Sequence, residues 1–208
     1  MAANSPKHWG QTPKNHHYLG LAHSSCGTIF AKEIIQHQLL LKLLTMANIG
    51  IFYGSTTGMC EDVARRMAEK LGGANVWNAS ELDAAKVAAC DVLLLGSSTW
   101  GAGELQDDWY GACNTLHNLN LTGKKVALFS VGDSVGYGDT FCGALRALYD
   151  AVKDTGATLM GQVSTDGYTY DDSEAVIDGQ FVGLALDETN EADKTDARID
   201  AWLASMEL

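Results

Sequence analysis

Apolar segments of strand length alternate with amphipathic segments over most of the chain. The run Ile49–Tyr53 predicts a first strand, and the apolar residues of 63–71 recur at the spacing of one helix face. Strands are also predicted at 74–77, 91–96, 125–131, 157–162 and 181–186, and helices at 80–89, 139–155 and 194–206. Strands and helices in alternation predict an α/β fold, a doubly wound parallel sheet with helices on both faces.

Capping residues mark the ends of two predicted helices. Ser80, followed three residues later by Asp83, is typical of a capped helix start. Gly156 stands where a glycine C-cap would end the helix predicted over 139–155.

Three loops follow the carboxyl ends of predicted strands, which is the edge where doubly wound sheets bind ligands. They comprise residues 54–60, 96–105 and 132–139. The first leads straight into a helix, so backbone N–H groups and the positive end of the helix dipole converge on a site suited to phosphate. It has neither the lysine of nucleoside-triphosphate loops nor the G-x-G-x-x-G spacing of dinucleotide-binding loops. A charge-neutral phosphate cradle and a Ser/Thr-rich turn that only caps its own helix both fit this loop.

Two large aromatic residues stand beside glycines in the other loops, Trp100 in the second and Tyr137 in the third. Exposed aromatic rings on loops are favourable where they cover a flat guest. Either ring alone also fits an anchor packed on the protein itself. Together with a phosphate cradle, the two rings predict a site for a phosphorylated flat heterocycle.

Charge divides the chain near Met46. Residues 1–46 carry four lysines and one glutamate, whereas 47–208 carry the other 10 basic and 25 acidic residues, which gives 10 − 25 = −15. The first part also holds both prolines, and its apolar run Leu39–Leu41 is too short for a secretory signal. We therefore expect residues 1–45 to be an appendage, either disordered or the product of a mis-assigned start, and 46–208 to be the folded domain. A targeting or docking helix over 29–44 is the alternative.

Composition limits the partners and the compartment. The net charge of −12 argues against nucleic acid and anionic membranes and favours basic protein partners. Five cysteines without C-x-x-C spacing indicate reduced thiols in a cytoplasmic protein rather than a disulfide framework or a zinc site. No apolar run approaches the roughly 20 residues of a membrane span.

The loop motifs resemble those of the flavodoxins. The similarity is carried by Gly54–Gly58, Ser98–Gly101, Gly132–Asp133, Tyr137 and Phe141–Cys142. It extends over essentially all of 47–206, and residues 164–168 and 178–187 resemble the long-chain subgroup, in which an insertion interrupts the last strand. The resemblance implies a five-stranded sheet of order 2-1-3-4-5, with 157–162 and 181–186 as two halves of the last strand, and a bound FMN.

The resemblance also implies the residues that bind FMN, and it implies no catalytic or metal-ligating residue. The FMN-binding residues would be Ser55, Thr56, Thr57, Gly58, Met59, Cys60, Ser98, Thr99, Trp100, Gly101, Gly132, Asp133, Tyr137, Phe141 and Cys142. Residues 55–60 would hold the phosphate, Thr99 would contact ribityl or phosphate oxygens, and the rings of Trp100 and Tyr137 would sandwich the isoalloxazine. Gly132, Asp133 and Cys142 would line its pyrimidine edge.

Two residues of the first loop depart from the family. Met59 and Cys60 stand where flavodoxins usually have Asn and Thr. Since a weak thiol would replace a hydroxyl donor, we expect FMN to bind less tightly than is usual in the family, by about 1 kcal/mol.

A flavodoxin is a low-potential one-electron carrier that shuttles FMN between semiquinone and hydroquinone, and it is not an enzyme. The resemblance implies that the carbonyl of the Gly101–Ala102 peptide turns toward the protonated flavin N5, with Gly101 supplying the positive φ that this turn needs. Nearby acidic residues, among them Glu104 and Asp133, would disfavour the anionic hydroquinone. The implied protein is a monomer that meets basic redox partners, such as a ferredoxin/flavodoxin–NADP reductase, a pyruvate oxidoreductase or a nitrogenase reductase.

Two other functions fit part of the sequence. An FMN-dependent NAD(P)H:quinone oxidoreductase of the same fold needs a second pocket beside the flavin, and no added loop or basic cluster predicts one. A receiver-type signalling domain needs acidic residues after the first and third strands, where Ser55 and Ser98 stand. His117 lies in a predicted connecting region and is expected to be a surface residue.

Overall fold

The computed structural model describes residues 32, 34, 36, 47–206 and 208. The chain divides into two units, 1–46 and 47–208, and the second unit holds the sheet. In the first unit Lys32, Ile34 and Gln36 are helical and exposed. The rest of the predicted appendage lies outside the described residues, so the expectation about it stays a prediction.

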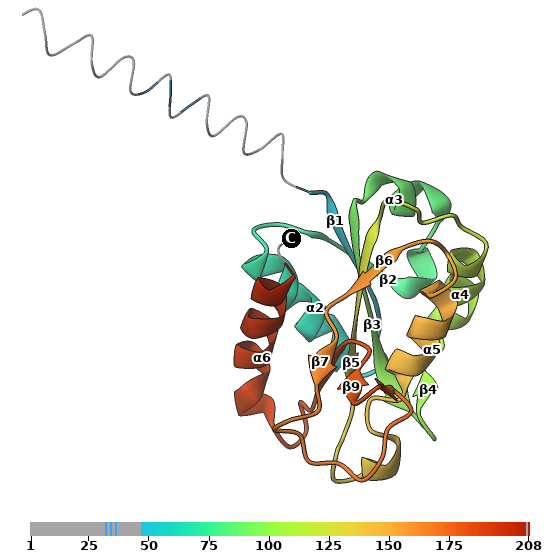
Figure 1. The fold of residues 1–208 in the computed structure, drawn as a ribbon, viewed down its shortest axis with the longest axis vertical. Coiled ribbons are helices and arrows are strands. Elements are labelled where there is room, and N and C mark those ends of the chain that lie inside the picture. Colours follow the sequence, from blue (N-terminus) through green and yellow to red (C-terminus); the bar gives the residue numbers. More distant parts are fainter. Residues whose placement is uncertain (1–31, 33, 35, 37–46, 207) are drawn as a thin grey trace, which may run out of the picture. The chain divides into compact units, whose positions relative to one another are not determined.

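A parallel sheet forms the centre of residues 47–208 (Figure 1). Its strands run in the order β2-β1-β3-β5, and both β6 and β10 pair with β5 at the far edge. The strands are β1 (Ile49–Gly54), β2 (Asn75–Asn78), β3 (Val92–Trp100), β5 (Lys125–Val131), β6 (Thr158–Met160) and β10 (Leu184–Leu186). A short strand β4 (Glu104–Leu105) adds antiparallel to the end of β3.

The edge strand is formed by two separate segments. β6 pairs with Lys125–Ala127 at the start of β5, and β10 pairs with Phe129–Val131 at its end. Both run parallel to β5, so they are two halves of one interrupted strand. This confirms the predicted sheet order 2-1-3-4-5 and the predicted insertion in the last strand.

Helices cover both faces of the sheet. The elements α2 (Met59–Lys70) and α6 (Ala192–Ser205) lie on one face, and α3 (Ala84–Ala89), α4 (Trp109–His117) and α5 (Ala144–Val152) lie on the other (Figure 1). Successive residues of a strand point to opposite faces. In β3, accordingly, Leu93 and Leu95 pack with the second group of helices and Leu94 packs with the first.

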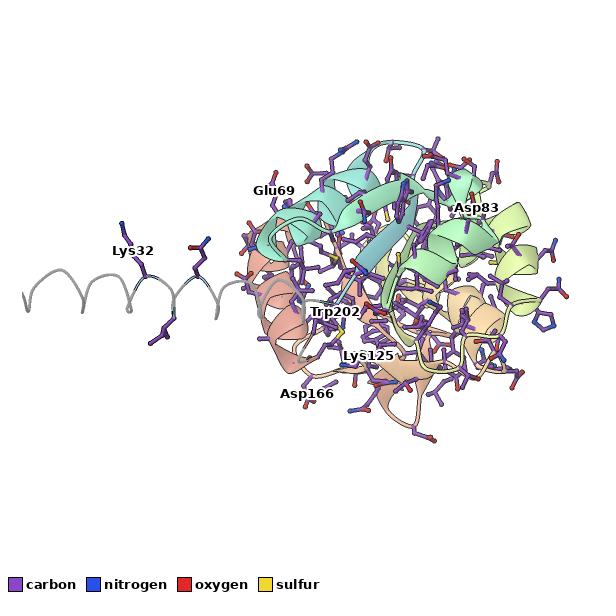
Figure 2. The ribbon with its side chains drawn as sticks, turned by 90° about the horizontal axis from the view of Figure 1, so that it is seen from above. Lys32, Glu69, Asp83, Lys125, Asp166 and Trp202 are labelled. Atoms are coloured by element: carbon purple, nitrogen blue, oxygen red, sulfur yellow. The ribbon has the colours of Figure 1, made fainter. Side chains whose placement is uncertain are left out.

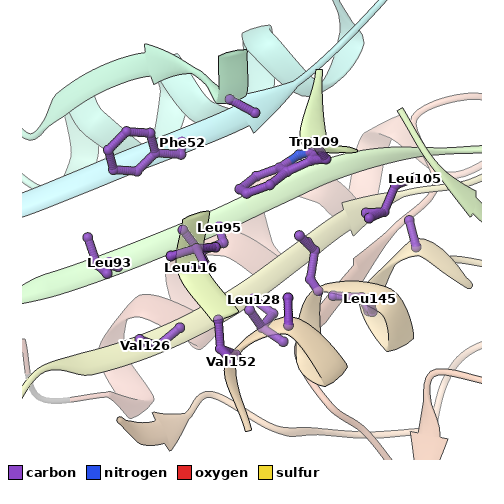
Figure 3. Packing of buried hydrophobic residues seen from close by; sticks show 14 of the residues in the cluster. Phe52, Leu93, Leu95, Leu105, Trp109, Leu116, Val126, Leu128, Leu145 and Val152 are labelled. Carbon is purple, nitrogen blue, oxygen red and sulfur yellow. The ribbon is translucent and has the colours of Figure 1, made fainter. Parts of the chain in front are cut away.

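The two cores are fully buried and apolar. Figure 3 shows Trp109 and Leu116 of α4 and Leu145 of α5 over strand residues of the core beneath α3, α4 and α5. In the core beneath α2 and α6, Trp202 of α6 is 3% exposed. Glu69 of α2, labelled at the edge of the domain in Figure 2, is exposed. Burial at this scale holds the strand ends, and the loops that follow them, in fixed positions.

The insertion forms a small antiparallel sheet of its own. Its strands are β7 (Val163–Ser164), β8 (Val176–Ile177) and β9 (Gln180–Phe181), in the order β7-β9-β8. The buried Phe181 packs against Tyr168 with ring centroids 5.1 Å apart, and Phe141 stacks on Tyr170 at 5.6 Å. The insertion therefore packs against the loop that follows β5.

The predicted start of the helix over 80–89 is wrong. A 3₁₀ turn η1 (Ala79–Glu81) comes first, and the extended Leu82 separates it from α3. The side chain of Asn78 accepts a hydrogen bond from the Ser80 N–H at 2.8 Å, and Asp83 accepts one from the Lys86 N–H at 2.7 Å. Asn78 and Asp83 are therefore the caps, and Ser80 is not.

The helix predicted over 139–155 is too long at both ends. A 3₁₀ turn η2 (Gly138–Thr140) precedes α5, and the extended Phe141 and the positive φ of Cys142 (+51°) break the helix between them. α5 ends with Lys153 as its C-cap, so Gly156 lies beyond the helix end.

Helix α4 was not predicted, and His117 is its last residue rather than part of a connection. The side chain of His117 is exposed, as expected. Among the helices of the described residues, none is long and apolar enough to cross a membrane.

Candidate functional site

A cavity lies at the carboxyl ends of the strands, among the loops that follow β1, β3, β5 and β10. Its lining is formed by Thr57, Met59, Ser98, Thr99, Trp100, Gly101, Val131, Gly132, Asp133, Tyr137, Thr140, Phe141, Cys142 and Thr189. The structure thus brings together the predicted residues of the second and third loops, the predicted Phe141 and Cys142, and two predicted residues of the first loop, Thr57 and Met59. The predicted residues Ser55, Thr56, Gly58 and Cys60 do not line this cavity.

Three lining residues were not predicted from the sequence. Val131 is the last residue of β5, and Thr189 follows the carboxyl end of β10, so the strand-end rule applied to every strand would have found both. Thr140 is the last residue of η2, directly after the third loop, and its buried hydroxyl oxygen has no hydrogen-bond partner within the described part of the chain. A buried hydroxyl without a partner beside a cavity is suited to a polar ligand.

The first loop is neutral and rich in backbone N–H groups. The Ser55 hydroxyl accepts a hydrogen bond from the Gly58 N–H at 3.1 Å, and Gly58 adopts a φ of +88° as the N-cap of α2. The first helical hydrogen bond runs from the Asp62 N–H to the Gly58 carbonyl at 2.9 Å. The N–H groups at the start of α2 therefore have no carbonyl partner within the helix, and free N–H groups of this kind bind phosphate.

The Cys60 thiol is not a donor in this loop, contrary to the expectation from the sequence. Its side chain is 0% exposed and packs in the core beneath α2, and burial raises the pKa of the thiol far above its usual range. The contribution of Cys60 to a phosphate site is therefore limited to its backbone N–H.

The second loop is shorter than the predicted 96–105, because β3 continues to Trp100 and β4 begins at Glu104, and it is a tight turn over Trp100–Gly103. The Gly103 N–H donates to the Trp100 carbonyl at 3.0 Å, and Gly101 has a φ of +51° whereas Ala102 is not among the residues with positive φ. Positive φ at only the first central residue is typical of a type II′ turn. Gly101 thus has a positive φ in this conformation, and the expectation that this φ serves the turned peptide stays a prediction.

A chain of hydroxyls supports the same loop. The Ser130 hydroxyl donates to the Ser97 carbonyl at 2.7 Å and lies 3.0 Å from the Thr99 hydroxyl. Because a serine hydroxyl has a single proton, Thr99 is the donor to Ser130. The remaining lone pair of Thr99 is therefore suited to accept a hydrogen bond from a ligand hydroxyl.

The third loop is held by two carboxylates. Asp133 accepts hydrogen bonds from the Gly136 N–H and from the Asn190 amide, both at 2.8 Å, and these bonds lower the pKa of Asp133. The buried Asp187 accepts from the Ser134 hydroxyl at 2.6 Å. The loop is thereby fixed while Tyr137 remains 59% exposed, and Trp100 in the second loop is 42% exposed.

Sheet order and cavity position define a flavodoxin-like α/β domain. The family model for flavodoxin matches residues 51–202. Flavodoxin 1 of Azotobacter vinelandii is 46% identical over 168 residues, which cover 78% of this chain and 97% of that protein. The flavodoxin of Synechococcus elongatus is 40% identical over 164 residues, covering 77% and 96%. The chain therefore belongs to the flavodoxin family.

A solved structure agrees with this assignment. The crystal structure of the Fusobacterium nucleatum flavodoxin bound to flavin mononucleotide superposes with a TM-score of 0.73 at 32% identity. The match covers 78% of this chain and 98% of that one. The fold of residues 47–208 is therefore that of a flavodoxin over nearly the whole length of the solved protein.

Proposed function

We propose that the cavity binds FMN and that the domain carries single electrons between redox proteins. The observation that carries this proposal is the placement of two exposed aromatic rings, Trp100 and Tyr137, on one cavity beside a neutral, N–H-rich loop. The family relatives are flavodoxins, and the Fusobacterium nucleatum protein holds FMN. A quinone reductase is not favoured by any of these relatives.

Each part of the cavity suits one part of FMN. The N–H groups of 55–60 would hold the phosphate, the Thr99 oxygen would accept from the ribityl chain, and the two rings would stack on the isoalloxazine. Gly132, Asp133 and Cys142 would face the polar edge of the ring. Bound FMN supplies one-electron chemistry, and these residues bind it, orient it and exclude water from it.

The acidic surface suits basic partners. The domain carries a charge of −15 by the count of its acidic and basic residues (10 − 25), and complementary charge speeds the encounter of two redox proteins. Partners of this kind would be a ferredoxin/flavodoxin–NADP reductase, a pyruvate oxidoreductase or a nitrogenase reductase, met in the cytoplasm by a monomer.

The test is an anaerobic reductive titration of the protein reconstituted with FMN and followed by visible absorption. Two one-electron steps at well-separated potentials are expected, together with electron transfer to a basic reductase at a rate that falls with salt. Direct two-electron reduction by NAD(P)H alone would favour the quinone reductase instead. Failure to bind FMN would refute both functions.

Replacing Cys60 by threonine is expected to tighten FMN binding by about 1 kcal/mol, roughly fivefold. Threonine can place its methyl where the buried sulfur lies and direct its hydroxyl toward the loop. Cys60→Val is the matched control, since it has the same shape without the hydroxyl. Equal dissociation constants for the two variants, measured by quenching of FMN fluorescence, would contradict the expectation.

Replacing Ala102 by glycine is expected to raise the potential of the first one-electron couple by about 40 mV. Turning the central peptide of a type II′ turn gives a type II turn, which moves the positive φ from Gly101 to Ala102. An alanine in that conformation costs about 1 kcal/mol, and glycine removes this cost. Ala102→Val should shift the potential the opposite way, and equal potentials in all three proteins would exclude the turned peptide.

A further inference from the structure

The peptide between Phe141 and Cys142 connects the insertion to the cavity. Both residues line the cavity and both are buried. A Cβ on Gly132 would lie 2.9 Å from the Cys142 nitrogen, so the absence of a side chain at Gly132 leaves space directly beside this amide. The amide therefore lies at the cavity edge formed by Gly132 and Asp133.

The Cys142 N–H is a buried donor whose acceptor is not in the described chain. The thiol of Cys142 bonds to the carbonyls of Ser130 and Leu186 at 3.6 Å, and the Cys142 carbonyl accepts from the Leu145 N–H at 3.0 Å. None of the hydrogen bonds among the described residues is donated by the Cys142 N–H. Buried amides without an acceptor are rare in folded proteins, so this one marks the place of an acceptor atom of a ligand.

Ser173 fixes the direction of this amide from the opposite side. Its hydroxyl, in a side chain that is buried in the insertion, donates to the Phe141 carbonyl at 2.6 Å and accepts from the Ala175 N–H at 3.2 Å. The carbonyl of Phe141 and the N–H of Cys142 belong to one planar trans peptide, so they point in opposite directions. A carbonyl held toward Ser173 directs the N–H away from the insertion.

The insertion is itself anchored to the third loop, which makes Ser173 a firm support. The N–H groups of Asp171 and Asp172 both donate to the Gly138 carbonyl, at 2.8 and 2.9 Å, and the ring of Tyr170 stacks on Phe141. Cys142 has a φ of +51°, which is unfavourable for a residue with a Cβ and has to be maintained by its surroundings.

We propose that Ser173 is a positioning residue for the cofactor. Its hydroxyl orients the Phe141–Cys142 peptide so that the Cys142 N–H donates a hydrogen bond to an acceptor atom on the polar edge of the flavin ring. This inference rests on the proposed function, and it gives the insertion a direct part in holding the ring.

The experiment compares three variants of the full chain. Ser173→Ala removes the donor, Ser173→Thr keeps a hydroxyl, and Ser164→Ala is the control, because Ser164 is an exposed serine of the same insertion that accepts only from the Asp166 N–H. The readouts are the FMN dissociation constant, the Cys142 amide shift in ¹H–¹⁵N spectra with and without FMN, and hydrogen exchange of that amide in the FMN-free protein.

Ser173→Ala is expected to weaken FMN binding about five- to tenfold, to reduce the shift of the Cys142 amide on FMN addition and to speed its exchange without FMN. Ser173→Thr should restore all three, and Ser164→Ala should match the unmodified protein. A Ser173→Ala protein that melts earlier but keeps the FMN affinity and the amide shift would overturn the proposal. The exchange measurement needs no cofactor. If the protein does not bind FMN, the proposed function is refuted, and the exchange rate of the Cys142 amide still decides whether Ser173 orients the Phe141–Cys142 peptide.

Discussion

Replacing Asp187 by alanine is expected to lower the free energy of unfolding by about 3 kcal/mol or more. The carboxylate is 0% exposed and stands at the carboxyl end of β10. It accepts hydrogen bonds from the N–H and hydroxyl of Ser134, from the Thr189 N–H, and from both the N–H and the side-chain amide of Asn190. Alanine leaves the Ser134, Thr189 and Asn190 N–H groups without this acceptor, whereas the Asn190 side-chain amide keeps its bond to Asp133.

The loss is measured by urea unfolding of the FMN-free protein. Asp166→Ala is the control, because Asp166 is an exposed aspartate whose removal should change the stability by less than about 0.5 kcal/mol. Because Ser134 lies between Asp133 and Tyr137 in the third loop, FMN affinity should fall together with stability. Equal unfolding midpoints for the two variants would show that the Asp187 network does not stabilise the domain.

The same carboxylate gives the stability a dependence on pH. Desolvation by burial acts to raise the pKa of Asp187, but the hydrogen bonds from Ser134 and Asn190 outweigh it and hold the pKa below its usual value. A folded-state pKa below the unfolded one means that the stabilisation is complete above about pH 4 and is lost as the pH falls through the folded value. The stability curve of Asp187→Ala should therefore be flatter at acid pH than that of the unmodified protein.

Much of the fold follows from the sequence because the strands are buried on both faces. The strand predicted at 125–131 is β5 with the same bounds, since the apolar run 126–129 is of the kind that is buried on both faces of a parallel sheet. Helix α4 carries its signal as well, because Trp109, Ala112 and Leu116 are its buried residues at helical spacing. The glycine in its first turn and the loop predicted nearby concealed that pattern.

The ends of the helices could not be predicted where tertiary contacts decide them. The segment 139–155 has helical composition throughout, yet the hydrogen bond from Ser173 to the Phe141 carbonyl holds that residue extended. The partner lies 32 positions along the chain. A local pattern contains no information about a contact of that range, and Ser173 itself carried no motif that could single it out.

Replacing Trp100 or Tyr137 by alanine is expected to weaken FMN binding by about 2 kcal/mol each, roughly thirtyfold. Both rings line the cavity and are partly exposed, Trp100 by 42% and Tyr137 by 59%, so each would bury further apolar surface and gain a stacking contact on binding the flavin. Stability without FMN should change little, because neither ring belongs to the buried cores. Fluorescence titration with FMN measures the affinity, and urea unfolding measures the stability.

Two controls separate stacking from general effects of losing an aromatic side chain. Tyr110 is an equally exposed tyrosine (60%) on α4 that does not line the cavity, so Tyr110→Ala should leave FMN affinity unchanged. Tyr137→Phe keeps the stacking ring and should retain most of the affinity. If the rings contact opposite faces of one flavin, the double variant should lose about the sum of the two single losses, because the rings then share no contact with each other. A double variant no weaker than either single one would show that the rings do not act on the same bound ring system, and the sandwich arrangement would have to be abandoned.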